Sequence, residues 1–163
     1  MAIRIETPNL NEADRLRELR LRALADAPYA FGTDYKVESE KPIEYWQDYL
    51  KNTDWCFAVI DGVDIGLLAV DIADADRNSD CWMASWWLEE AYRGQGIPKL
   101  MLDWLDNLCI SKGWKKQGLG VWPENERAIA AYLKLGFVKG EKPLPSRSRP
   151  DKMYLPMYRN LPL

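Results

Sequence analysis

The spacing of hydrophobic and polar residues changes along the chain, and each change predicts a new secondary-structure element. Alternation over Ile3–Glu6 predicts a short strand at the start. Further alternating or continuous apolar segments predict six more strands, at 55–60, 65–72, 81–88, 117–122, 137–138 and 153–158. Apolar residues at helical spacing predict four helices, one from Asn9 or Asn11 to about Ala25, and others at about 43–51, 97–111 and 124–135.

Turn signals indicate how these elements are organised. Asp61-Gly62 predicts a tight hairpin between the second and third strands. Polar residues at 71–80 and a Pro- and Arg-rich stretch at 142–150 predict loops. No internal repeat or long linker interrupts the order of elements. We therefore expect a single α/β (α+β) domain over residues 1–163, with one mixed sheet flanked by helices.

Composition narrows the setting in which this domain works. The chain has 163 residues, 47% of them hydrophobic and 29% charged, which is typical of a globular protein. It has no apolar run of about 18 residues and no apolar signal stretch at Met1–Glu6, so we expect a cytoplasmic protein without a membrane partner. Cys56, Cys81 and Cys109 are widely spaced and form no CxxC pair, which argues against a disulfide framework or a metal site.

The chain contains no histidine, and this excludes several kinds of catalysis. Serine or cysteine nucleophiles that depend on a histidine base are ruled out. An acid or base must come from a carboxylate, tyrosine, cysteine, lysine or water. The net charge of -3 disfavours binding to nucleic acid and leaves open an enzyme that acts on a small amine.

A glycine-rich segment, Arg93-Gly94-Gln95-Gly96-Ile97-Pro98, lies between a predicted strand and a predicted helix. Glycine permits tight backbone turns, and the start of a helix offers unpaired N–H groups, so the segment is a candidate phosphate cradle. A glycine turn before a helix is also common as a purely structural feature. Pro98 suits the first helical position but lacks one N–H, and that loss weakens phosphate binding by roughly 1.5–3 kcal/mol.

A second segment, Asn125 to Phe137, carries two further candidates. Asn125 suits the cap of the following helix. Tyr132 lies two helical turns further along the same face. By itself, each residue also has a structural interpretation, as a cap and as a half-buried core aromatic.

Together these segments resemble the GNAT superfamily of acyl-CoA-dependent N-acetyltransferases. The matching string runs from Leu88 to Pro98, continues at Leu119-Gly120-Val121, and ends with Asn125-x-x-Ala128-x-x-x-Tyr132-x-x-x-Gly136-Phe137. The resemblance is strong between Trp82 and Phe137 and looser in the N-terminal half. It implies a mostly antiparallel, twisted sheet of about six or seven strands with a splayed central strand pair, flanked by about four helices. It also implies acetyl-CoA as the acyl donor.

The resemblance further implies a role for each matching residue. The segment from Arg93 to Pro98 would wrap the CoA pyrophosphate with main-chain N–H groups. Main-chain groups of Trp86, Trp87 and Leu88 would contact the pantetheine arm, and the Leu88 N–H would polarise the thioester carbonyl. Asn125 would contact the pantetheine arm as well. Tyr132 would be the general acid that protonates the departing thiolate, which suits a phenol that is protonated at pH 7.

The general base is where the sequence departs from the family pattern. Many relatives carry a glutamate where this chain has Gly120, and others place a carboxylate where Trp82 stands. Asp80 would share a strand face with Trp82, which makes it one candidate, the alternative being a solvated loop residue. Water relayed through main-chain carbonyls is a further candidate, so the base stays unassigned.

The acceptor pocket of this fold usually lies between the N-terminal helices and the splayed strands. Aromatic residues of that region form either a pocket for an apolar or cationic amine or part of the core: Phe31, Tyr35, Trp46, Tyr49, Trp82 and Trp86. Four aspartates of the polar loop would either attract a cationic substrate or simply face solvent: Asp71, Asp74, Asp76 and Asp80.

We therefore expect an N-acetyltransferase that moves an acetyl group from acetyl-CoA to a primary amine of a small molecule. Direct attack in a ternary complex needs no covalent enzyme intermediate, so the lack of histidine is no obstacle. One alternative is a protein acetyltransferase that acts on an N-terminus or a lysine. Another is a CoA-binding sensor without turnover, which Pro98 and Gly120 favour and Tyr132 disfavours. A homodimer is compatible with the sequence, but no element requires one.

Overall fold

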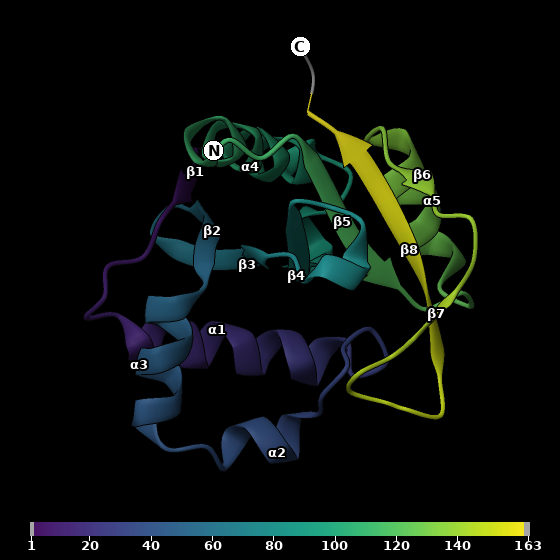
Figure 1. Cartoon of the computed structure of the whole chain (residues 1–163). Coiled ribbons are helices and arrows are strands. Elements are labelled where there is room, and N and C mark those ends of the chain that lie inside the picture. The colour runs from purple at the N-terminus through teal and green to yellow at the C-terminus, as the bar shows by residue number, and fades with distance from the viewer. Residues whose placement is uncertain (1, 162–163) are drawn as a thin grey trace.

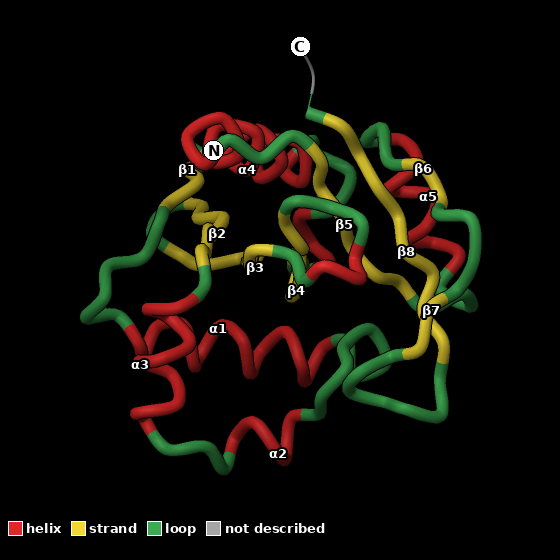
Figure 2. The backbone as a smooth tube through the Cα atoms, in the orientation of Figure 1, coloured by secondary structure: helices red, strands yellow, loops and turns green. Residues whose placement is uncertain are grey.

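The computed structural model describes residues 2–161, which form a sheet with helices on both sides (Figures 1 and 2). The strands are β1 (Ile3–Glu6), β2 (Asp54–Ile60), β3 (Val63–Ile72), β4 (Cys81–Leu88), β5 (Lys116–Val121), β6 (Val138–Lys139), β7 (Leu144–Pro145) and β8 (Met153–Asn160). The α-helices are α1 (Ala13–Asp26), α2 (Tyr35–Ser39), α3 (Ile43–Asn52), α4 (Ile97–Lys112) and α5 (Glu126–Lys134). Two short 3₁₀ turns, η1 (Ala75–Arg77) and η2 (Glu90–Tyr92), flank β4. The two ends of the predicted domain, residue 1 and residues 162–163, lie outside this range.

One sheet connects these strands in the order β1-β2-β3-β4-β5-β8-β6, and β7 pairs with β8. Every pair is antiparallel except β4–β5, which is parallel. The parallel pair is short: its only partners are Cys81↔Gln117, Trp82↔Gly118 and Met83↔Leu119. Beyond Met83 the two strands separate. The predicted mostly antiparallel sheet with a splayed central pair is therefore confirmed.

Helices cover both faces of the sheet and divide the core in two. The strands alternate their side chains between the faces, so Phe57 packs toward α1 and α3 whereas Cys56 packs toward α4. Leu16 and Trp46 fill the first core, and Met101 belongs to the second. In Figure 1, α1, α2 and α3 lie together below the sheet, and α4 lies above it. The splay between β4 and β5 thus opens in the middle of a rigid, two-sided scaffold.

The structure adds helix α2 and strand β7 to the predicted helices and strands, and several predicted boundaries shift by a few residues. Helix α2 has five residues and is capped by Asp34, whose side chain accepts a hydrogen bond from the Val37 N–H. It is too short to produce an amphipathic repeat. Strand β7 is a two-residue pairing with β8, within the loop predicted at 142–150. Asn9 does not cap α1: it forms a turn with Glu12, which takes the cap position.

Candidate active site at the splayed strands

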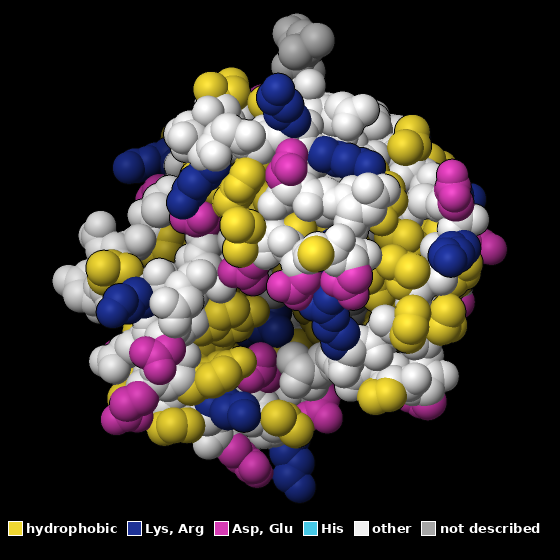
Figure 3. Space-filling view, in the orientation of Figure 1, with side chains coloured by type: hydrophobic (Ala, Val, Ile, Leu, Met, Phe, Trp, Pro, Cys, Tyr) yellow, Lys and Arg dark blue, Asp and Glu magenta, His cyan; other side chains and the backbone are white. Residues whose placement is uncertain are grey.

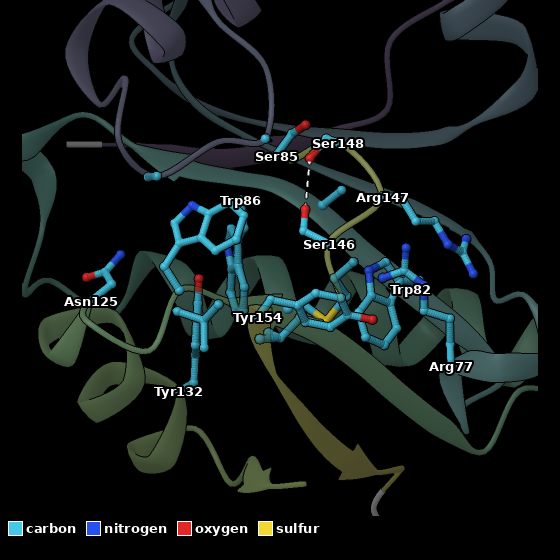
Figure 4. A pocket seen from close by; sticks show the side chains of 18 residues that line it. Arg77, Trp82, Ser85, Trp86, Asn125, Tyr132, Ser146, Arg147, Ser148 and Tyr154 are labelled. Carbon is cyan, nitrogen blue, oxygen red and sulfur yellow. Dashed lines mark hydrogen bonds between the residues drawn. The ribbon is translucent and has the colours of Figure 1, made fainter. Parts of the chain in front are cut away.

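A cavity of about 330 Å³ opens where β4 and β5 separate (Figure 4). Residues 82–86 of β4 and 119–121 of β5 form two of its walls. Asn125 and Tyr132 close one end, and loop residues 146–148 close another part of the wall. Of the predicted cofactor residues, Trp86, Asn125 and Tyr132 therefore meet at one cavity, although they are far apart in the sequence.

A β-bulge in β4 produces part of this opening. The pairing between β3 and β4 shifts between Leu67 and Ala69, and Ser85 has a positive φ of 54°. The Ser85 hydroxyl accepts a hydrogen bond from Arg20 of α1, and Arg20 forms a buried ion pair with Glu38 of α2 at 3.3 Å. Bulges bend a strand and re-aim its side chains. The buried Arg20 guanidinium therefore holds β4 in a strained conformation at the wall of the cavity.

The main chain at the end of β4 turns Leu88 toward the splay. The Glu89 N–H donates to the Ile65 carbonyl of β3 at 2.8 Å. In an antiparallel ladder the neighbouring residue points its N–H and C=O the other way. The Leu88 amide therefore faces away from β3, whereas its side chain is buried in the core. Trp87, by contrast, pairs with Leu67 of β3, and its indole N–H donates to Asp26 of α1 at 2.8 Å.

The glycine-rich segment forms an exposed turn that leads into α4. Gly94 and Gly96 have positive φ values of 77° and 80°, and a Cβ on either would meet nothing within 4 Å. Gly96 is the cap of α4, so Pro98 occupies the second helical position rather than the first. Helix starts leave four N–H groups unpaired, and here Gly96, Ile97 and Lys99 keep theirs. Open space and free donors coincide at this turn.

Arg93 braces this turn against the end of β4. Its Nε donates to the Leu88 carbonyl at 3.0 Å, and its guanidinium lies 3.5 Å from the Asp26 carboxylate. The Gln95 side chain donates to the Ala91 carbonyl at 3.4 Å. In this structure both side chains hold the turn in shape, and the main chain of the turn faces solvent.

Asn125 is both a helix cap and a cavity residue. Its Oδ1 accepts a hydrogen bond from the Ala128 N–H at 3.2 Å, as expected for the cap of α5. The cap fixes the side chain at the mouth of the cavity, where its NH₂ group keeps its hydrogen-bonding capacity (Figure 4). The two interpretations made from the sequence therefore do not exclude each other.

Tyr132 presents its hydroxyl to the cavity beneath Trp86 (Figure 4). The two rings are stacked, with centroids 5.5 Å apart and an interplanar angle of 19°. Phe137 packs against the tyrosine from another side, at 6.0 Å. Burial raises the pKa of Tyr132 to about 12, so the phenol is protonated at neutral pH. Within the described residues its hydroxyl has no hydrogen-bond partner, which leaves it able to donate to a bound molecule.

The other end of the cavity contains an aromatic group that the sequence analysis did not assemble. Trp82 and Tyr154 pack edge to face with centroids 6.0 Å apart, and Arg77 of η1 lies over Trp82, 4.2 Å from the ring centroid. Two glycines of β5 make room for the rings. A Cβ on Gly118 would lie 2.8 Å from the Trp82 ring, and one on Gly120 would lie 2.8 Å from the Tyr154 ring. We call Trp82 and Tyr154 the aromatic shelf.

The aromatic shelf gives a physical reason for Gly120. Many relatives carry a glutamate there, but in this chain Tyr154 occupies the space that its side chain would need. Tyr154 was missed because it belongs to β8, far from the matching motifs in the sequence. Tyr154 and Pro156 alternate along β8, which pairs with β5, and this alternation was the sequence signal that places both side chains on one face of the sheet.

Most of the aromatic residues proposed for an acceptor pocket belong to the core. Trp46 is fully buried, Phe31 is buried beside it, and Tyr49 packs on Trp55 at 4.8 Å. Tyr35 lies on exposed α2, away from the cavity. Only Trp82 and Trp86 of that group line the cavity, so the core interpretation is correct for Phe31, Trp46 and Tyr49, and Tyr35 belongs to neither.

Asp80 is a structural residue in this fold. Its carboxylate accepts the N–H groups of Lys115 and Lys116 at 2.7 and 2.9 Å, and these bonds lower its pKa. A carboxylate stabilised in its charged form is a poor base, and Asp80 does not line the cavity. Asp74 and Asp76, from the same loop, are paired with Arg147. These three loop aspartates are therefore engaged in bonds within the protein, and none of the four lines the cavity, which favours the alternative that they do not attract a substrate.

Three further properties concern the described part of the chain as a whole. Cys56, Cys81 and Cys109 are buried free thiols. Within residues 2–161, no group of three or more acidic or cysteine side chains is arranged to hold a metal ion. None of the helices in that range combines the length and apolar character needed to cross a bilayer.

Comparison with known proteins places this arrangement in context. The model of the acetyltransferase (GNAT) family matches residues 17–137. The uncharacterized N-acetyltransferase YdgE of Bacillus subtilis is 25% identical over 145 residues, which cover 84% of this chain and 92% of that protein.

Solved structures share the fold at lower identity. The acetyltransferase of the GNAT family from Streptococcus pneumoniae superposes with a TM-score of 0.74 and 18% identity, covering 99% of this chain and 100% of that one. YncA from Salmonella typhimurium, a putative acetyltransferase solved with its cofactor acetyl-CoA, has a TM-score of 0.73 and 16% identity over 100% of this chain and 96% of its own.

Proposed function

The chain belongs to the GNAT acetyltransferase family, and from this premise we propose that it transfers an acetyl group from acetyl-CoA to the primary amine of a small molecule. The observation that carries the proposal is the placement of Tyr132. Its unpartnered hydroxyl enters a cavity at the splay, and the Leu88 amide, at the end of β4, points away from β3. The Leu88 N–H would donate to the thioester oxygen, and the Tyr132 hydroxyl would donate to the sulfur.

The exposed turn before α4 suits the diphosphate of acetyl-CoA. The main-chain N–H groups of Gly96, Ile97 and Lys99 are unpaired within the helix, and the positive end of the helix dipole lies there. Gly94 and Gly96 leave space for the ligand to approach the backbone. The pantetheine arm would then follow the splay past Trp86 and Asn125. In this role acetyl-CoA is a substrate, and main-chain N–H groups of this chain hold its diphosphate.

The reaction is a direct displacement. The amine nitrogen attacks the thioester carbon, and the C–N bond forms as the C–S bond breaks. Negative charge that develops on the carbonyl oxygen is stabilised by the Leu88 N–H. The sulfur leaves with the bonding electron pair, is stabilised by a hydrogen bond from the Tyr132 hydroxyl, and gains its proton from water as solvent enters.

The proton of the attacking amine needs a different route. Asp80 is tied to two backbone amides, and the residues that line the cavity include no carboxylate. We infer that water in the cavity carries this proton to solvent. This choice between the two candidates follows from the bonds that Asp80 makes.

A thiol-release assay with acetyl-CoA and a panel of primary amines tests the proposal. The panel includes peptides with a free N-terminus or a lysine, and calorimetry measures CoA binding in parallel. Release of thiol with a small amine is the expected result. Release with peptides alone would favour the protein acetyltransferase, and tight CoA binding without any release would favour the sensor.

A further inference from the structure

The charges that line the cavity are all positive. Two arginines, Arg77 and Arg147, contribute to its wall, and no aspartate or glutamate does. A cavity that selects a polyamine or another multiply charged cation needs acidic groups to replace the lost hydration of its ligand. This cavity offers the opposite sign of charge.

The two arginines differ in what they already bind. The Arg147 guanidinium is engaged by Asp74 and Asp76, whose side chains are 67% and 72% exposed on the outer side of the loop. Arg77 has no carboxylate within salt-bridge distance among the described residues, although its charge contributes to the lowered pKa of Asp76. Arg77 is therefore the guanidinium of the cavity that is still able to bind an anion.

The aromatic shelf fixes where that guanidinium can act. The Arg77 guanidinium carbon lies 4.2 Å from the Trp82 ring centroid and 5.4 Å from that of Tyr154, so both rings hold it in place while no carboxylate of the described residues pairs with its N–H groups. An arginine held in this way presents paired N–H donors in the geometry that suits a carboxylate or a phosphonate. In Figure 4, Arg77 lies at the end of the cavity opposite Asn125 and Tyr132, and Tyr154 lies between them.

We propose that the acceptor amine carries an oxyanion, a carboxylate or phosphonate, which Arg77 binds at the end of the cavity away from Tyr132. The amine of such a molecule would point toward the splay, and its apolar middle would lie on the aromatic shelf. This inference rests on the proposed acetyl transfer for its orientation, but its charge preference is a property of the cavity itself.

Pairs of compounds that differ only in the anion test the proposal. One set compares 4-aminobutyrate and 6-aminohexanoate with their amides, and another uses the phosphonates of equal length. Chains of this length keep the amine pKa nearly equal within a pair. Thiol release gives KM for each compound, and calorimetry in the presence of CoA gives Kd whether or not turnover occurs.

The acids are expected to bind at least about tenfold more tightly than their amides, as a charge-assisted hydrogen bond would provide. Arg77→Gln should remove that preference, and Arg77→Glu should shift it toward diamines such as 1,4-diaminobutane. Arg17→Gln removes an exposed cation of α1 outside the cavity and should leave the preference unchanged. The Kd for CoA and the thermal midpoint report whether each variant is folded.

The outcomes separate this inference from the proposed function. Preferential binding of the acids without thiol release from any compound would support the anion site and count against acetyl transfer. Thiol release from amides or diamines, with acids no better, would support acetyl transfer and overturn the anion site. Equal acid preference in wild type and Arg77→Gln, or no binding of any acid at millimolar concentration, would also overturn it.

Discussion

Tyr132 combines a useful position with an unfavourable acidity. Burial raises its pKa to about 12, so the phenol releases its proton less readily than a phenol in water does. The phenol is protonated at neutral pH, as expected from the sequence, but the same burial weakens it as an acid. The physical consequence is that Tyr132 acts first as a hydrogen-bond donor that stabilises the developing thiolate. The thiolate then gains its proton as solvent enters and CoA leaves.

Replacement of Tyr132 by phenylalanine tests this role. The variant keeps the ring that stacks on Trp86 at 5.5 Å and removes only the donor. Turnover should fall by roughly ten- to a thousandfold, while the Kd for CoA stays nearly unchanged. Stopped-flow thiol release would follow the chemical step directly. Tyr35→Phe, on exposed α2, is the matched loss of a hydroxyl and should have no effect. An unchanged chemical step in Tyr132→Phe would exclude the acid role.

The residues that sequence alone identified share one property: each lies in a local motif. The glycine turn and the capped start of α5 depend on neighbours within a few positions, so Gly96, Asn125 and Tyr132 could be placed in advance. Tyr154 could not, because it reaches the cavity only through the pairing of β8 with β5. The bulge at Ser85 was hidden for the same reason: its partner Arg20 is on α1.

At the scale of an element, the start of α4 combines two opposing effects of proline. Pro98 stands at the second helical position, where its fixed φ favours the helix and its missing N–H removes a donor from the turn. Pro98→Ala should restore that donor and tighten CoA binding by about tenfold, as expected for one hydrogen bond to a charged oxygen. Isothermal titration of wild type and variant measures it, with the thermal midpoint as the control for folding. Weaker binding by the variant would mean that the preset helix geometry matters more than the donor.

The packing of β5 against β8 makes a second prediction for an element. A methyl group on Gly120 would lie 2.8 Å from the Tyr154 ring, so Gly120→Ala must displace that ring. Such overpacking costs about 1–3 kcal/mol of the free energy of unfolding. In a Tyr154→Ala background the same substitution should cost much less, because the ring is gone. Urea unfolding of the four proteins in this double-mutant cycle measures the coupling. Equal costs in both backgrounds would show that Gly120 is not required by Tyr154.

At the scale of the whole molecule, each face of the sheet is packed against its own hydrophobic core, and the cavity lies where β4 and β5 separate. Four β4-side contacts explain why the opening persists: β4 is held by β3, by Arg20 and Asp26 of α1, and by Arg93 after η2. None of these depends on β5. Hydrophobic patterning predicted a single mixed sheet flanked by helices. The mostly antiparallel order and the splay were implied by the resemblance to the GNAT superfamily. The shape and charge of the acceptor end were not predictable, because they depend on how loop 73–80 meets β8.

Asp80 connects that loop to the start of β5, and its charge makes global stability depend on pH. Its folded-state pKa lies below the ordinary 3.8, because two backbone N–H groups stabilise the carboxylate. The resulting stabilisation is complete above about pH 5 and disappears as the pH falls through the folded-state pKa.

Asp80→Asn keeps one acceptor oxygen and removes the charge. We expect it to lower the free energy of unfolding by about 1 kcal/mol at pH 7, a value reduced by the exposure of the site. The difference from wild type should shrink below pH 4. Asp76, whose pKa is also lowered, is present in both proteins and cancels from the comparison. Urea unfolding at pH 7, 5 and about 3 measures the difference, and a gap that is constant across this range would show that the charge of Asp80 does not contribute.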